Sequence, residues 1–173
     1  MWPYEVIDNY LDDKTFNKLN NEIKDIVPED GKIYRKWLDY DPTPQIETLV
    51  KNYAVRRHYG PYKKFIHFAV TPAGFVHPEH DEAEFKIMSA IVYLSPEKNK
   101  GTTLIDYSKI SLYDGVPEKI TVDWKPNRLM NFCGLTQNTW HYYESTDVRY
   151  TYNYFLVDPD KIQNEEYKKY CID

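Results

Sequence analysis

The sequence has few cysteines, no long apolar run and no basic leader. Its two cysteines, Cys133 and Cys171, allow one disulfide at most and show no metal-ligand spacing such as Cys-x-x-Cys, so we expect a core thiol and a tail thiol. No apolar stretch approaches the ~20 residues that span a bilayer. Residues 1–5 lack the basic and then apolar layout of a secretory signal. These absences predict a cytoplasmic protein without a membrane span.

Positive charge is also scarce. The 173 residues hold 22 Lys and Arg against 27 Asp and Glu, which gives a formal net charge of -5 and a pI near 5.6. A general attraction to nucleic acid is therefore not expected. The chain shows no repeat, low-complexity tract or linker, and 42% hydrophobic with 28% charged residues is ordinary for a soluble globular protein. Its length predicts a single domain, residues 1–173.

Aromatic residues are abundant, with 17 tyrosines and 16% aromatic residues overall, which favours strands. Helical spacing is confined to the first third, where we expect helices over residues 11–26 and 44–55. From residue 64 the apolar period becomes that of strands, separated by turns rich in Pro, Gly and Asn. The expected strands are 65–70, 75–82, 87–94, 102–107, 120–124, 129–132, 139–143 and 149–157.

Eight short strands at this spacing predict a mainly β fold with flanking helices, a double-stranded β-helix or jelly roll. We expect residues 1–63 to form a helical support region on the outside of one sheet, 64–157 to form the jelly-roll core and 158–173 to form a carboxyl-terminal tail. Within that tail, residues 164–169 predict a short surface helix.

The segment from His77 to Glu82 contains His-x-Glu twice, as His77/Glu79 and as His80/Glu82. Residues i and i+2 of a strand share a face, so either pair can present an imidazole and a carboxylate to one ion. His141, on a later expected strand, supplies a third ligand. Two histidines and one carboxylate form the facial triad of non-haem Fe(II) oxygenases. The sequence therefore predicts a metal site with two candidate registers.

A candidate anion site follows eight residues after His141. Arg149 and Thr151 open the last expected strand and share a face by alternation. An arginine grips a carboxylate through two parallel hydrogen bonds, and a neighbouring hydroxyl completes the cradle. Such a pair is usually a solvent-facing ladder, but after a metal-binding histidine it predicts a carboxylate anchor.

Four pieces in this order resemble the 2-oxoglutarate and Fe(II)-dependent dioxygenases, particularly the prolyl-hydroxylase-like branch and its small phage-encoded members. The pieces are the run His80 to Lys86, the strand Ser89 to Leu94, the turn Asn99 to Thr102, and Trp140-His141 followed by Arg149-x-Thr151. The resemblance covers roughly residues 65–157. For a phage-encoded protein, the expected compartment is the cytoplasm of the host cell.

The resemblance implies the site and its chemistry. Relatives often carry a basic residue six positions after the first ligand, as Lys86 stands to His80. This favours His80, Glu82 and His141 as the Fe(II) ligands and catalytic residues, with His77/Glu79 as the fallback pair.

The cosubstrates are also implied by the resemblance. Arg149 and Thr151 would bind 2-oxoglutarate, and Tyr93 would add a second contact unless it only packs in the core. With O2, the reaction would couple decarboxylation of 2-oxoglutarate to succinate with hydroxylation of a peptide, peptidyl proline, an amino acid, a nucleobase or a small metabolite.

Two other classes of function remain open. A cupin-like metal-dependent isomerase or hydrolase would use more histidines and no dedicated carboxylate grip. A non-catalytic ligand-binding jelly roll would use aromatic residues such as Trp37, Tyr40 and Trp124 as a platform. The stretch 53–62, with Arg56, Arg57 and His58, is either a solvated helix end or part of the cavity opening. His67 is either a hydrogen-bonded core histidine or a cavity residue.

Overall fold

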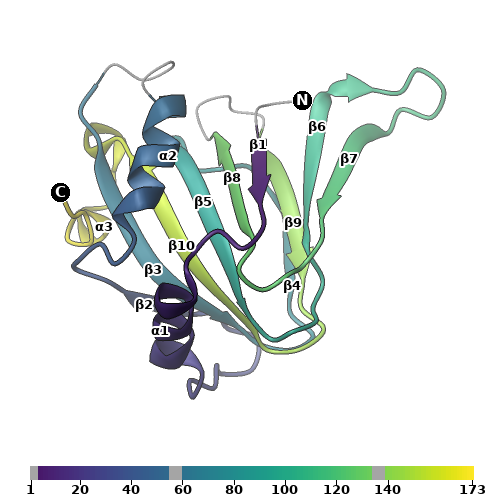
Figure 1. Cartoon of the computed structure of the whole chain (residues 1–173). Helices are drawn as coiled ribbons and strands as arrows, with labels where there is room; N and C mark the ends of the chain where they lie inside the picture. Colours follow the sequence, from purple (N-terminus) through teal and green to yellow (C-terminus); the bar gives the residue numbers. More distant parts are fainter. Residues whose placement is uncertain (1–3, 55–59, 134–138) are drawn as a thin grey trace.

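The computed structural model describes residues 4–54, 60–133 and 139–173, and it contains two antiparallel sheets packed face to face (Figure 1). The six-stranded sheet has the order β1-β8-β5-β10-β3-β2, and the four-stranded sheet has the order β4-β9-β6-β7. The strands are β1 (Tyr4–Ile7), β2 (Tyr34–Trp37), β3 (Lys63–Thr71), β4 (Val76–His80), β5 (Lys86–Ser95), β6 (Thr102–Ile110), β7 (Pro117–Val122), β8 (Leu129–Cys133), β9 (Trp140–Glu144) and β10 (Arg149–Val157). The helices are α1 (Asp13–Ile23), α2 (Pro44–Ala54), α3 (Glu165–Lys168) and a short 3-10 helix, η1 (Pro159–Lys161).

The predicted jelly roll is confirmed, and each of the eight expected strands has its counterpart among β3 to β10. The amino-terminal region differs from the expectation of helices alone, because it also supplies β1 and β2. Each has four residues and lies at an edge of the six-stranded sheet. Such short edge strands carry charged residues and give little periodic signal, which is why the sequence pattern did not predict them.

Helices α1 and α2 cover the outer face of the six-stranded sheet (Figure 1). Helix α1 begins at Asp12, whose side chain accepts a hydrogen bond from the Thr15 amide (2.9 Å) and caps the helix. The apolar side of the two helices packs on the outward residues of the sheet. Buried contributors are Leu19, Ile23, Ile46, Ile66, Phe68, Val92, Leu94, Tyr152, Tyr154 and Leu156. This interface holds more buried apolar residues than either of the other two core clusters, so its burial should contribute strongly to stability.

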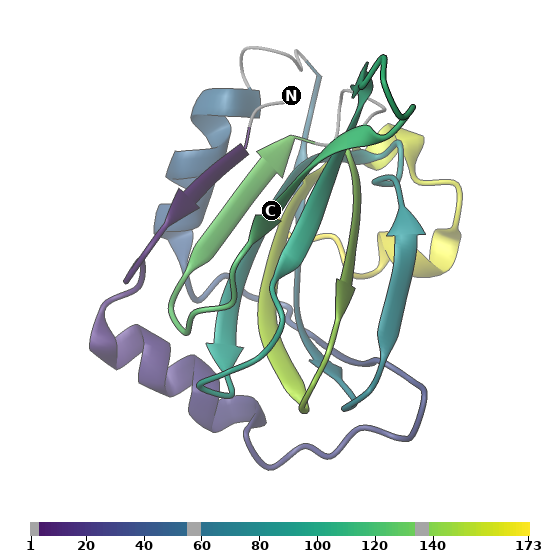
Figure 2. The same cartoon turned by 90° about the vertical axis from the view of Figure 1, so that its right-hand side faces the viewer.

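The inner face of the same sheet has a different character. Strand alternation on β10 turns Arg149, Thr151, Asn153 and Phe155 inward, where they line a cavity of about 360 Å³ between the sheets. Figure 2 views the molecule from the side of the four-stranded sheet that closes this space. Among the described residues, no helix is both long and apolar enough to cross a membrane.

Candidate functional site

His80 and His141 face each other across neighbouring strands. They are direct partners in the β4–β9 register, and their ring centroids are 4.2 Å apart. The Nδ1 of His80 bonds the Pro78 carbonyl (2.9 Å), and the Nδ1 of His141 bonds the Thr139 carbonyl (2.8 Å). A carbonyl only accepts, so each Nδ1 donates and each Nε2 keeps its lone pair. Burial lowers the pKa of both rings and favours their neutral form, which a metal ligand requires.

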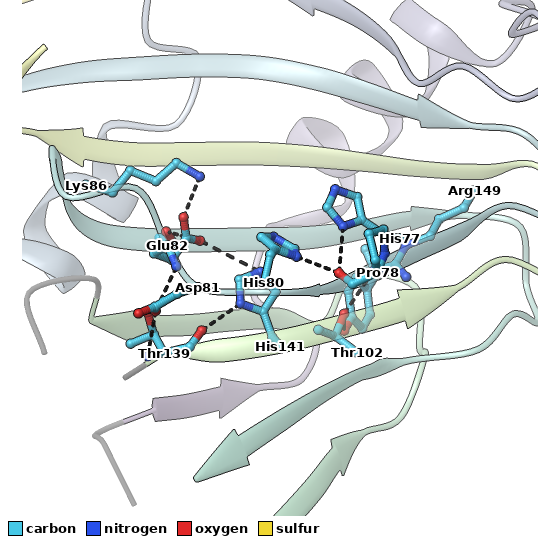
Figure 3. A network of polar contacts seen from close by, with 12 residues as sticks. His77, Pro78, His80, Asp81, Glu82, Lys86, Thr102, Thr139, His141 and Arg149 are labelled. Carbon is cyan, nitrogen blue, oxygen red and sulfur yellow. Dashed lines mark hydrogen bonds and ion pairs between the residues drawn. The ribbon is translucent and has the colours of Figure 1, made fainter. Parts of the chain in front are cut away.

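Glu82 adds a carboxylate to the two imidazoles (Figure 3). Its Oε1 lies 3.9 Å from the Nε2 of His141 and accepts a hydrogen bond from Ser89 (2.9 Å). Its Oε2 pairs with the Lys86 ammonium at 2.5 Å. Burial alone would raise the pKa of Glu82, but the Lys86 charge and the hydrogen bonds from Lys86 and Ser89 act against burial, and the pKa is lowered to about 2. The carboxylate is therefore ionised at neutral pH.

The rival pair does not share a face. His77 lines the cavity, but Glu79 is exposed and accepts a hydrogen bond from Tyr107 instead. An irregularity in the β4–β9 register between His77 and His80 interrupts the strand alternation that was expected for both pairs. Glu82 lies after the end of β4 and still lines the cavity.

Asp81 links the end of β4 to the start of β9, the two strands that carry the imidazoles, by hydrogen bonds. Its Oδ1 accepts hydrogen bonds from the Thr139 amide and hydroxyl, both at 2.8 Å, and from the Glu82 amide at 2.8 Å. Thr139 in turn orients His141 through its carbonyl. Among the residues that the structure describes, no three His, Cys, Asp or Glu side chains lie close enough together to bind one metal ion in their present positions.

Arg149 lies at the other end of the same cavity and has no carboxylate partner among the described residues. The side chain is 2% exposed, its Nη2 donates to Thr102 Oγ1 (3.0 Å), and its buried Nη1 has no hydrogen-bond partner. The guanidinium carbon is 4.1 Å from the centroid of the Tyr143 ring. A buried, unpaired cation is costly, so this position favours an anionic ligand.

The two other predicted anchor residues occupy different places. Thr151 lines the cavity beside Arg149, as alternation predicts. Its Oγ1 accepts from Asn153 (3.2 Å), which leaves its hydroxyl hydrogen free to donate. Tyr93 is fully buried, stacks on Trp124 and donates to Thr102 Oγ1 (2.9 Å). The guanidinium carbon of Arg149 also lies 5.2 Å from the centroid of the Tyr93 ring.

Sequence reasoning missed the supporting residues Asp81, Ser89, Thr102 and Thr139. Thr102 did carry a signal, because it follows Gly101. A Cβ added at Gly101 would lie 1.9 Å from the Val122 carbonyl oxygen, so only glycine fits there. Thr139, which bonds Asp81 through its amide and its hydroxyl, lies 58 residues away, and no local pattern predicts this contact.

The expected role of residues 53–62 is answered only in part. Arg56, Arg57 and His58 lie outside the described residues. Tyr62 packs against the outer core, and its hydroxyl donates to Glu47 (3.1 Å).

Three solved structures are similar over most of the chain. A prolyl-4-hydroxylase from Pseudomonas putida is 15% identical, with a TM-score of 0.63 over 89% of this chain and 91% of that chain. The viral collagen prolyl hydroxylase of Paramecium Bursaria Chlorella virus-1 is 15% identical, with a TM-score of 0.61 over 88% and 94%. The α-ketoglutarate-dependent epimerase SnoN from nogalamycin biosynthesis is 15% identical, with a TM-score of 0.68 over 90% and 78%.

No protein-family model matches the chain, and no curated protein sequence matches it. The structural likeness confirms the expected resemblance to prolyl-hydroxylase-like 2-oxoglutarate oxygenases at the level of the fold.

Proposed function

We propose that residues 1–173 form a single 2-oxoglutarate- and Fe(II)-dependent oxygenase domain that hydroxylates a substrate at the cavity. The observation that carries the proposal is the pairing of two features in one cavity of about 360 Å³. At one end, two neutral imidazoles and an ionised carboxylate form a two-histidine, one-carboxylate donor set. At the other end, Arg149 is buried, and its Nη1 has no hydrogen-bond partner among the described residues.

The two imidazoles and the carboxylate are suitable ligands for Fe(II). The guanidinium of Arg149 suits the far carboxylate of 2-oxoglutarate, because its Nη1 has no hydrogen-bond partner among the described residues. His80, Glu82 and His141 would hold the metal, and Arg149 and Thr151 would hold the cosubstrate. When bound, these groups would supply the oxidative chemistry that uses O2 and couples decarboxylation of 2-oxoglutarate with substrate oxidation. Lys86 and Ser89 position the Glu82 carboxylate, and Thr102 positions Arg149.

The geometry supports His80/Glu82 over His77/Glu79 as the ligand pair. Glu82 is 8% exposed and lines the cavity, whereas the exposed Glu79 bonds Tyr107. A carboxylate that is oriented by a lysine and a serine is also prearranged for a ligand role.

The rival classes are less consistent with the site. A non-catalytic aromatic platform needs its rings together, but Trp37 and Trp124 belong to separate clusters and each stacks on a tyrosine. A cupin-like hydrolase gives no reason for an unpaired Arg149. Of the three similar structures described above, two are prolyl hydroxylases and SnoN is an epimerase, so hydroxylation is the part of the proposal that product analysis must establish.

The test is an anaerobic titration of the protein with Fe(II), followed by 2-oxoglutarate. We expect a visible charge-transfer band that requires both components. Glu82→Gln should weaken Fe(II) binding and abolish the band, while its control Glu79→Gln should retain both. Exposure to O2 should then yield succinate, and mass spectrometry of product from an added substrate would reveal a gain of one oxygen.

The alternative register makes the opposite prediction for the histidines. Retained Fe(II) affinity in His80→Ala with loss in His77→Ala would move the site to the fallback pair. A band that forms without 2-oxoglutarate, or no band at all, would contradict the oxygenase proposal and favour one of the rival classes.

A further inference from the structure

The cavity extends beyond the candidate iron site to the gap between two unpaired sheet edges. Strand β2 is the edge of one sheet and β4 is the edge of the other. Arg35 and Trp37 of β2 and His77 and His80 of β4 all line the cavity, so the space opens between these edges. We call the part of the cavity lined by Arg35, Trp37, Phe65, His67 and Phe155 the outer half. It contains none of the residues assigned to 2-oxoglutarate.

A second unpartnered polar group lies in the outer half. His67 of β3 lines the cavity and is 6% exposed, and its Nδ1 has no hydrogen-bond partner. Its ring packs 4.6 Å from Trp37 and 5.5 Å from Phe155, measured between centroids. A histidine that serves only packing normally has its buried nitrogens bonded. Burial lowers the pKa of His67 well below its usual value, so the imidazole is neutral and able to donate or accept.

The charges of the lining are unbalanced. Among the described residues of the cavity, Arg35, Lys86 and Arg149 are cationic and Glu82 is the single carboxylate. Lys86 already pairs with Glu82. The guanidinium of Arg35 has no ion pair or hydrogen bond in the described part of the chain, although the protein as a whole has a net charge of -5. A cationic opening in an acidic protein selects anions.

The dimensions and walls restrict the ligand further. About 360 Å³ is near the lower end of the roughly 300–1,000 Å³ that ligand pockets span, and 2-oxoglutarate would occupy part of it. Trp37, Phe65 and Phe155 give the outer half apolar walls. Tyr170, which does not line the cavity, stacks on Trp37 with 4.4 Å between the ring centroids and so helps to hold the Trp37 ring in place. The remaining space suits a small molecule with an apolar body better than a peptide chain.

We propose, on the basis of the function proposed above, that the outer half is a substrate subsite for a small carboxylic acid. Arg35 pairs with the carboxylate, and His67 bonds a polar group of the body. This arrangement leaves the apolar carbon atoms between the Arg35 rim and the imidazoles of His80 and His141. Arg35 and His67 are therefore substrate-binding residues, distinct from the 2-oxoglutarate anchor.

The experiment uses a matched pair of probes, 3-(4-hydroxyphenyl)propanoate and its neutral amide, 3-(4-hydroxyphenyl)propanamide, whose ring hydroxyl is the polar group of the body. Saturation-transfer NMR measures their affinities for the full chain, with and without saturating 2-oxoglutarate. We expect the carboxylate to bind more tightly than the amide by about two- to fivefold, the range for a partly exposed charge pair. This preference should persist when 2-oxoglutarate is present, because Arg149 is then occupied.

Three variants assign the contacts. Arg35→Gln should remove the preference for the carboxylate. Its neighbour Lys36 pairs with Glu22 (3.5 Å) and lies over Phe68 on the outer face, so Lys36→Gln should leave both affinities unchanged. His67→Phe keeps a ring and removes the nitrogens, and it should weaken both probes equally.

Three results would overturn the proposal: equal binding of the two probes, loss of the carboxylate preference on adding 2-oxoglutarate, and failure of the carboxylate to bind at millimolar concentration. The binding readout needs no turnover, so its failure is separable from that of the oxygenase proposal. If the charge-transfer band forms but the carboxylate does not bind, the substrate class alone is wrong. If the carboxylate binds but no band forms, the oxygenase proposal is wrong.

Discussion

The two faces of strand β10 differ in whether their buried polar side-chain atoms have hydrogen-bond partners. On the outer face, Tyr152 bonds Thr43 (2.7 Å) and Tyr154 bonds Asp41 (3.0 Å), so both hydroxyls are satisfied within the helix-covered core. On the inner face, the Nη1 of Arg149 has no hydrogen-bond partner within the described part of the chain. Both faces are buried, so burial alone does not distinguish them. Unmet hydrogen-bonding capacity distinguishes a face built for a ligand from one built for stability.

The largest expected effect is on the outer face. Phe68 is fully buried, and its ring lies 5.5 Å from that of Tyr152. Phe68→Ala should lower the free energy of unfolding by about 3–5 kcal/mol, because it removes buried surface and leaves a cavity. Urea denaturation monitored by circular dichroism measures this loss. A change below about 1 kcal/mol would show that the outer face does not contribute strongly to stability.

A substitution on the inner face should weaken ligand binding and leave stability almost unchanged. Arg149→Met keeps an apolar stem but removes the charge, and it should weaken 2-oxoglutarate binding to the Fe(II)-loaded protein by about 30-fold to several thousand-fold, or about 2–5 kcal/mol. Without 2-oxoglutarate, the free energy of unfolding should change by less than about 1 kcal/mol, because no ion pair is broken.

Arg149→Lys separates charge from shape. It keeps the cation but loses the planar fork, so its affinity for 2-oxoglutarate should fall between those of the wild type and Arg149→Met. Anaerobic titration gives the affinities, and urea denaturation gives the stabilities. Unchanged 2-oxoglutarate affinity in Arg149→Met would place the anchor elsewhere and remove the main support for the proposed function.

The contrast between the faces also explains what the sequence could predict. Alternation along β10 predicts that Arg149 and Thr151 share a face, and both line the cavity. The same rule was wrong for His77 and Glu79, because the register irregularity in β4 depends on pairing with β9. Arg35 was missed because β2 is a four-residue edge strand. Periodicity thus predicts faces within a strand, whereas contacts between distant segments depend on the tertiary fold.

Gly101 bears on both the stability of the fold and the candidate site. The loss of stability on its substitution should be smaller than that of Phe68→Ala. A Cβ would meet backbone atoms of Val122 at 1.9 Å and 2.8 Å, which cannot move aside as a flexible side chain would. Gly101→Ala should therefore cost roughly 1–3 kcal/mol of stability. It should also weaken 2-oxoglutarate binding, because the next residue, Thr102, orients Arg149. Lys100→Ala is the control, since Lys100 is exposed. Equal stability of the two variants would contradict the close packing.

The smallest expected effects come from one hydroxyl on each face of β10. Tyr152→Phe removes the bond to Thr43 and should lower the free energy of unfolding by about 1 kcal/mol, the usual net contribution of a neutral hydrogen bond. Its 2-oxoglutarate affinity should stay at the wild-type value, because the outer face does not touch the cavity.

Thr151→Val is the matched change on the inner face. Thr151 Oγ1 accepts from Asn153, so the hydroxyl hydrogen that it can give to a carboxylate disappears with the substitution. We expect 2-oxoglutarate affinity to fall about fivefold, equivalent to about 1 kcal/mol. Stability without ligand should change less than in Tyr152→Phe, because the bond from Asn153 is long (3.2 Å). If both variants lose stability alike and neither loses affinity, Thr151 serves packing as the tyrosines do, and the carboxylate anchor depends on Arg149 without it.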